Sequence, residues 1–156
     1  LWSEAGPLRW DDELESRFKW YLEAVAALEA IAVVPTGSEL STGRKDRDRL
    51  SDLFGRIPDT RRRVWAPGGI WNEEEAHPFA RRLGVTCAFD PLEDDSPGGD
   101  TAYARLKAIG GRQRFSEGIL YELVDALAGF ETAYVALESP LSFDEAVRLQ
   151  KLAAEA

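Results

Sequence analysis

The chain has 156 residues, of which 44% are hydrophobic and 10% aromatic, and this composition excludes an intrinsically disordered protein. Its formal net charge of −9 argues against general binding to nucleic-acid phosphates, which requires clustered Lys and Arg side chains. The sequence shows no signal peptide and no apolar stretch near the roughly 20 residues of a membrane-spanning helix. We therefore predict a single domain over residues 1–156.

The only cysteine is Cys87, which excludes an internal disulfide and a metal site built from several cysteines. Cys87 lies in the apolar run Val85–Phe89, which favours a buried thiol in a reducing, cytoplasmic setting. The short basic cluster Arg61-Arg62-Arg63 favours a solvated strand edge or a helix–strand turn over an anion or partner contact. We expect no metal ion and no cofactor. The chain begins at Leu1 and contains no methionine, so the sequence leaves open whether it is part of a longer gene product.

Helical and strand patterns alternate along the whole chain. The helical segments carry one apolar stripe, and the strand segments are short, continuous apolar runs typical of strands buried on both faces. We predict five strands, each followed by a helix, and one helix in front of them, although residues 92–100, after the third strand, have the acidic, turn-rich pattern of a loop. The predicted strands are residues 31–34, 63–65, 85–89, 101–106 and 132–137, and the predicted helices are residues 11–30, 45–54, 73–83, 116–128 and a last helix that starts at Ser142.

Two of these helices carry a specific signal at their start. Asn72 followed by Glu75 is a capping-box pattern, and Ser142 is predicted to cap the last helix with Glu145 at its third position. Pro78 conflicts with the first of these helices, and a start nearer Pro78 or a kink would resolve the conflict.

Strand–helix alternation at this spacing predicts parallel strands joined by right-handed crossovers. An eight-unit barrel takes about 250 residues, so five units make up about five-eighths of one. The predicted fold is therefore an α/β partial (β/α) barrel of about five strand–helix units, similar to a TIM barrel. An open doubly wound sheet fits the same periodicity and stays as the alternative.

The order of these segments resembles the YecE-like family, domain of unknown function 72. Residues Trp65–Trp71 (Trp-Ala-Pro-Gly-Gly-Ile-Trp) are similar to the family's Trp-Glu-Pro-Arg-Gly-x-Trp strand end, and Tyr103–Leu106 is similar to its Tyr-x-Arg-Leu-His-Gly strand. Phe89-Asp90-Pro91 looks like the end of the strand between them. The match keeps its order over most of residues 11–152. The resemblance implies an eight-stranded barrel whose first three strands have no counterpart in this chain.

This chain differs from the family mainly at polar positions near the strand ends. Chemistry in a barrel sits at those ends, so the resemblance implies a degenerate site. Asp90 and Arg105 are the polar family positions that remain. The family's Gln is replaced by Pro35, its Glu and Arg by Ala66 and Gly68, its His and the following Gly by Lys107 and Ala108, and its Asn-Asn by Glu138-Ser139.

Six residues are candidates for a ligand site, and each also has a structural interpretation. Asp90 and Arg105 end adjacent strands, so they form either a polar or anionic ligand site or one buried ion pair. Lys107 and Glu138 are either an acid–base couple or a surface pair. Trp65 and Trp71 either line the barrel mouth or cover its end.

Two further groups of residues carry weaker signals. The pairs Gly68-Gly69, Gly98-Gly99 and Gly110-Gly111 favour turns over phosphate-binding loops, because none matches a complete fingerprint. Trp2, Trp10 and Trp20 gather near the first helix, where a barrel without its first three strands should expose apolar surface.

The resemblance, with its degenerate site, predicts a YecE-like protein that acts as a non-catalytic binding or interaction subunit. We expect a homo-oligomer or a protein partner that covers the open sheet edges, and neither a membrane nor a nucleic acid. The alternative is a residual enzyme or small-molecule binder for a polar or anionic ligand at the C-terminal ends of the strands. Whether the chain is an enzyme stays open at this point.

Overall fold

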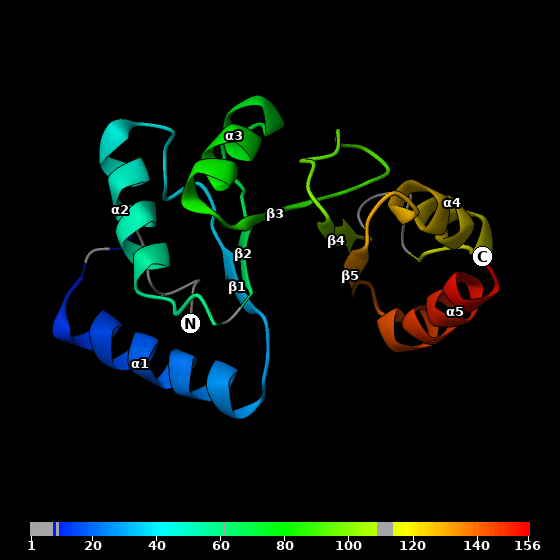
Figure 1. Ribbon diagram of the computed structural model, residues 1–156, viewed down its shortest axis with the longest axis horizontal. Coiled ribbons are helices and arrows are strands. Elements are labelled where there is room, and N and C mark those ends of the chain that lie inside the picture. Colours follow the sequence, from blue (N-terminus) through cyan, green and yellow to red (C-terminus); the bar gives the residue numbers. More distant parts are fainter. Residues whose placement is uncertain (1–7, 9, 61, 109–113) are drawn as a thin grey trace. The chain divides into compact units, whose positions relative to one another are not determined.

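The computed structural model describes residues 8, 10–60, 62–108 and 114–156 of the chain. Trp2, Arg61 and the Gly110-Gly111 pair lie outside these described residues. Within them the fold is α/β, with helices and strands in the predicted order (Figure 1). The helices are α1 (Asp12–Ala27), α2 (Arg44–Gly55), α3 (Glu73–Leu83), α4 (Glu117–Leu127) and α5 (Ser142–Glu155), and the strands are β1 (Ala32–Pro35), β2 (Arg63–Ala66), β3 (Thr86–Phe89), β4 (Thr101–Lys107) and β5 (Thr132–Glu138).

The strands pair in the order in which they follow one another along the chain, β1-β2-β3-β4-β5, and every pair is parallel. A doubly wound sheet reverses its strand order at a switch point, and this order has no reversal. The topology is therefore that of a partial (β/α) barrel, as predicted, and the doubly wound alternative is excluded.

The connection between β3 and β4 corrects the prediction that each strand is followed by a helix. Residues 90–100 form turns and bends, with no helix among them. Gly98 and Gly99 both have positive φ, 77° and 93°, which residues with a side chain rarely adopt. Together with the preceding Pro97 they end any helical continuation, and the glycine pair lies in an irregular, bent segment.

Two side-chain caps and one glycine fix further helix ends. An Asp11 carboxylate oxygen accepts a hydrogen bond from the Leu14 N–H at 2.8 Å, at the start of α1. Ser116 caps α4 through the Ile119 N–H at 3.4 Å. Gly84 ends α3 in the left-handed conformation, with φ of 65°. Local sequence therefore determines these boundaries.

The start of α3 confirms its predicted cap, whereas the start of α5 differs from its prediction. Helix α3 begins directly after Asn72, whose side chain accepts from the Glu75 N–H at 3.0 Å, and it runs through Pro78 rather than starting near it. One lost backbone bond at Pro78 is offset by good caps at both ends. In α5, Ser142 is the first helical residue and Leu141 occupies the N-cap position without a side-chain bond. The predicted Ser142 cap is therefore wrong.

Two compact units make up the chain, residues 1–87 and residues 88–156. In β3, Thr86 and Cys87 pair with β2, whereas Ala88 and Phe89 pair with β4. The prediction of a single domain over residues 1–156 stays a prediction. Each unit has its own apolar core among the described residues, and the largest fully buried side chains are Trp65, Phe54, Leu40, Leu50, Leu53 and Ile57 in the first and Phe115, Leu106, Leu120 and Leu123 in the second.

The first unit also accounts for several individual predictions. Trp10 packs edge-on against Phe18, with ring centroids 5.3 Å apart, and the Arg56 guanidinium lies 4.0 Å from its ring centroid. Trp20, by contrast, is 66% exposed. Cys87 is buried and forms no disulfide, as predicted. No helix among the described residues is both long and apolar enough to cross a bilayer.

Candidate functional site

Trp65 and Trp71 lie in the first unit, near the C-terminal end of β2, and both are buried. Their rings meet edge to face with centroids 4.8 Å apart, and Phe79 of α3 packs against both at 5.6 and 5.4 Å. The Trp65 indole N–H donates to the Thr36 hydroxyl at 3.0 Å. The Trp71 indole N–H donates to the Leu40 carbonyl at 3.2 Å. These contacts are structural, because each ring fills core space and each N–H has a partner within the unit.

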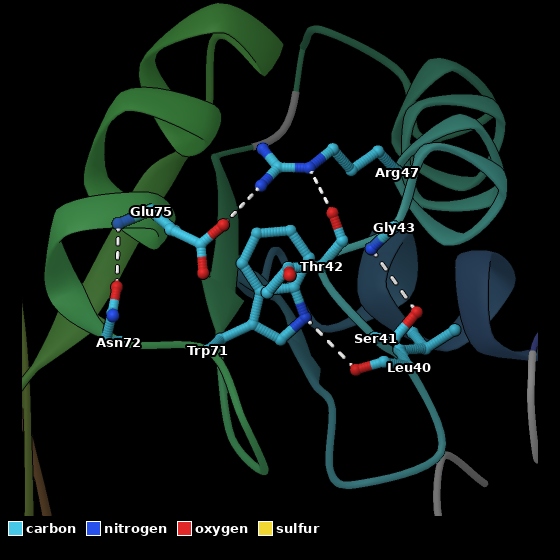
Figure 2. Close-up of polar contacts among 8 residues, drawn as sticks. All are labelled: Leu40, Ser41, Thr42, Gly43, Arg47, Trp71, Asn72 and Glu75. Carbon is cyan, nitrogen blue, oxygen red and sulfur yellow. Dashed lines mark hydrogen bonds and ion pairs between the residues drawn. The ribbon is translucent and has the colours of Figure 1, made fainter.

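Arg47 of α2 lies over Trp71 of this aromatic cluster (Figure 2). Its guanidinium carbon lies 4.8 Å from the Trp71 ring centroid and 5.2 Å from that of Phe79. The guanidinium also donates to the Thr42 carbonyl at 2.6 Å and to the Glu75 carboxylate at 2.9 Å. Glu75 therefore contacts Arg47 in addition to donating its N–H to the cap, and this use of its carboxylate was missed by the capping-box prediction.

Backbone from the loop after β1 fills the space beside Gly68. A Cβ atom at Gly68 would lie 2.5 Å from the Thr36 carbonyl oxygen, and one at Gly69 would lie 2.7 Å from Ser38 Cα. Gly69 also has a positive φ of 69°. Glycine is therefore required at both positions by close backbone packing, and these two residues act as turn and packing residues.

In the second unit, the side chains of β4 alternate between two environments. Ala102, Ala104 and Leu106 are fully buried in the core under α4 and α5. Arg105 and Lys107 alternate with them and therefore lie on the opposite face of the strand, at its C-terminal end. Barrel chemistry is found at this end of a strand.

Arg105 forms an ion pair with Glu138, the residue that ends β5. The Arg105 side chain is 28% exposed and that of Glu138 42% exposed. The backbone of Glu138 is in register with Lys107, as expected for strand neighbours, but its carboxylate binds Arg105. The structure thus places Arg105, Lys107 and Glu138 together at the ends of β4 and β5. The sequence predicted a couple of Glu138 with Lys107, whereas the ion pair is formed by Glu138 and Arg105.

Asp90 follows β3 and organises the start of the next loop. Its carboxylate accepts from the Leu92 N–H at 3.1 Å, and its own N–H donates to the Asp94 carboxylate at 2.7 Å. The predicted pairing of Asp90 with Arg105 stays a prediction.

Tyr103 lies two residues before Arg105 on the same face of β4 and was not among the predicted site residues. Burial raises the pKa of the Tyr103 hydroxyl above its ordinary value of 10.0, while the Arg105 charge opposes this rise and the Glu138 charge adds to it. Tyr103 therefore remains a neutral phenol, able to donate a hydrogen bond, at physiological pH. Its place at i−2 from Arg105 in a strand is the sequence signal that could have found it.

Glu145 is the fully buried acidic residue of the second unit, and sequence reasoning assigned it only to a helix cap. One carboxylate oxygen accepts from the Phe115 N–H at 2.7 Å, and the other accepts from the Ser139 hydroxyl. Ser139 in turn accepts from the Leu141 N–H at 3.1 Å. Glu145 thus joins the segment before α4 to the end of β5, a contact between residues 30 positions apart.

A cavity of about 580 Å³ lies between β5, α4 and α5 in the second unit. On β5 the residues that line it are exposed or half-buried, whereas the helix-facing residues of β4 are fully buried. Among the described residues, β5 pairs only with β4. The lining is mostly apolar and rich in alanine: Val124, Leu127, Ala128, Ala133, Val135, Leu137, Ala146, Leu149, Gln150, Ala153 and Ala156.

The fold was compared with those of solved structures. A crystal structure of a DUF72 family protein from Thermotoga maritima matches with a TM-score of 0.60 over 90% of this chain. This chain has the fold of a DUF72 family protein. The sequence identity is 16%, and the chain spans 63% of the length of that protein. No family model matches the sequence, and no curated protein matches it.

The DUF72 match confirms, at the level of the fold, the resemblance that the sequence motifs indicated. This chain spans 63% of the Thermotoga chain, which agrees with the expectation that it makes up about five-eighths of a barrel. Within the described residues, no group of three or more His, Cys, Asp and Glu side chains is placed to bind a metal ion.

Proposed function

We propose that this chain is a non-catalytic interaction subunit built on the DUF72 fold, which binds another polypeptide along β5. The observation that carries this proposal is the apolar cavity beside β5. Among the described residues, β5 pairs with another strand on one side only. An unprotected parallel edge next to apolar surface is a template for association. The proposal includes a reducing, cytoplasmic setting, in keeping with the buried Cys87 thiol.

Two features of the strand ends support a non-catalytic role. Backbone from the β1 loop occupies the space into which a side chain at Gly68 would extend. Glu138 already binds Arg105, one of the two polar family positions that remain. A substrate that needs this guanidinium would have to displace an existing ion pair.

Assembly and the effect of a charge in the cavity test this proposal. Ala133 is exposed and lines the cavity, so Ala133→Arg should leave the fold intact while weakening association. Tyr121→Arg, at a 51% exposed position of α4 that does not line the cavity, is the matched control. Light scattering would give the mass, and amide hydrogen exchange would report whether β5 is protected.

We expect a mass above the 17.3 kDa of one chain, or uptake of a partner, with slowed exchange in β5 that Ala133→Arg removes and Tyr121→Arg retains. A monomer at all concentrations, with rapidly exchanging edge amides in β5 and no effect of Ala133→Arg, would reject an interaction role.

The second candidate function is binding of a polar or anionic small molecule at the ends of β4 and β5. The observation that favours it is the placement of Tyr103, Arg105 and Lys107 on one face of β4. Inorganic phosphate and citrate, titrated by calorimetry, would test it. We expect binding that Arg105→Ala abolishes and that Lys19→Ala, on α1, retains; equal heats in all three proteins would reject this function.

A further inference from the structure

We infer that the partner is a second copy of this chain, which docks through α5 in an antiparallel helix pair. This inference rests on the proposed function and names its partner. It starts from α5, where Phe143 is 81% exposed and Val147 is 38% exposed. Phe143 is the most exposed large apolar side chain of the described residues. Both stand apart from the residues that hold α5 to the core, which are Glu145, Leu149 and Leu152.

The exposed side of α5 forms one stripe at helical spacing. Phe143, Val147, Gln150 and Ala154 recur at intervals of four, three and four residues, and all four are exposed. The N-terminal half of the stripe is large and apolar, and the C-terminal half is small or neutral. An antiparallel pairing therefore places Phe143 against Ala154 of the second copy and Val147 next to the two-fold axis, so that large residues meet small ones.

The charges beside this stripe also favour an antiparallel pair. Asp144 and Lys151 lie on the same flank, near opposite ends of the stripe, and are exposed. Antiparallel pairing brings Asp144 next to Lys151 of the second copy, twice by symmetry. A parallel pairing would place Asp144 against Asp144 and Lys151 against Lys151, which costs free energy.

The charged residues of α5 form no ion pair with the rest of the chain that the structure describes. Among the described residues, Asp144, Arg148, Lys151 and Glu155 form no ion pair, whereas α1 and α2 have pairs four residues apart such as Arg17–Glu13 and Arg56–Asp52. The apolar cavity lies beside the stripe, on the other flank of α5, where Ala146 and Ala153 line it together with Gln150 of the stripe. Docking on α5 would thus extend over the same surface that β5 leaves uncovered.

A charge-reversal cycle on the full chain tests this pairing. Asp144→Lys and Lys151→Asp each place like charges together at two symmetric contacts, so we expect each to raise the dimer dissociation constant about tenfold. The double variant restores opposite charges and should return to within about threefold of the original value. Sedimentation equilibrium measures the constants, and Lys45→Asp on α2 is the control for net charge.

Cysteine cross-linking tests the geometry independently of the affinity. Val147→Cys places two thiols across the two-fold axis, so oxidation should give a covalent dimer. Leu28→Cys, at a 76% exposed position of the first unit, is the control. Both variants keep the buried native Cys87, so any cross-linking through Cys87 is the same in the two proteins. We expect cross-linking of Val147→Cys well above that of Leu28→Cys.

Each other outcome overturns the inference and separates it from the proposed function. A dimer that neither single reversal weakens is formed by another surface, so the α5 pairing is wrong while the interaction role stands. A wild-type monomer with equal cross-linking of both cysteine variants rejects self-association. Protection of β5 by a different polypeptide, lost in Ala133→Arg, would then retain the interaction role.

Discussion

Glu145 shows how a single buried carboxylate can hold two distant segments together. Replacing it by alanine leaves the Phe115 N–H and the Ser139 hydroxyl without their acceptor in a buried place. We expect Glu145→Ala to lower the free energy of unfolding by about 3 kcal/mol, measured by urea denaturation. Glu145→Gln keeps one carbonyl oxygen as an acceptor and should lose clearly less. Equal losses in the two variants would show that the hydrogen bonds contribute little.

The ionisation of Asp46 should make the free energy of unfolding depend on pH in the acid range. The hydroxyl of Ser41 donates to its carboxylate at 2.6 Å, and this bond lowers the pKa of Asp46 below its ordinary value of 3.8, with further help from Arg49 and against the effect of burial. A pKa lowered by folding contributes stability that is fully present well above pH 3.8 and is lost as the pH falls through the folded value.

The measurement is a series of urea midpoints at decreasing pH. We expect Ser41→Ala, which removes the largest cause of the shift, to be less stable than the wild type at neutral pH and closer to it at strongly acid pH. A difference between the two proteins that stays constant with pH would contradict this assignment.

The two glycines at Gly68 and Gly55 form a matched pair of tests. A Cβ at Gly68 would meet the Thr36 carbonyl at 2.5 Å, whereas one at Gly55 in α2 would meet nothing within 4 Å. We expect Gly68→Ala to destabilise the protein by about 1–3 kcal/mol and Gly55→Ala to be neutral or to stabilise by up to about 1 kcal/mol. Thermal unfolding of both variants gives the comparison, and a neutral Gly68→Ala would mean that the loop moves freely.

Among the elements, α2 and α3 are joined through Arg47, which contacts Trp71, Thr42 and Glu75 (Figure 2). We expect Arg47→Ala to cost about 1–2 kcal/mol, more than Glu75→Ala, because it removes the aromatic and carbonyl contacts as well as the ion pair. A double-mutant cycle should give a coupling of about 0.5 kcal/mol between the two. A coupling as large as the whole effect of Arg47→Ala would show that the ion pair dominates.

The elements themselves could be predicted because their signals are local. Apolar periodicity and the caps Asp11, Ser116 and Gly84 lie within the segments that they define. The errors came where a distant residue competes for a side chain. Glu145 was read as part of a cap but binds Phe115, which lies 30 positions earlier in the sequence. The spacing of residues along a helix cannot predict a contact with such a distant residue.

At the scale of the whole molecule, all five tryptophans belong to residues 1–87. Tryptophan fluorescence therefore reports the first unit, while circular dichroism reports helices of both. Leu50→Ala and Leu120→Ala each remove a fully buried side chain, one per unit, at a cost of about 2–5 kcal/mol. We expect Leu50→Ala to shift the fluorescence transition and Leu120→Ala to shift only part of the dichroism. If both variants shifted both signals equally, the chain would unfold as one cooperative structure.

Strand direction was also predictable from the sequence, because helix–strand alternation predicts parallel strands, whereas the same alternation left a doubly wound strand order open. The candidate site was less predictable from the sequence. Its members were expected at strand ends, where Arg105, Lys107 and Glu138 do lie, but which of them pair depends on side-chain reach across β4 and β5. Tyr103 and the cavity beside β5 depend on burial, which is a property of the assembled unit.

The packing of Gly68 against Thr36 also makes two positions epistatic. A side chain at position 68, such as the arginine that the family resemblance implies there, would collide with the Thr36 carbonyl. The loop after β1 would have to change first. We therefore expect a side chain at position 68 to be tolerated only in a protein whose β1 loop has already changed.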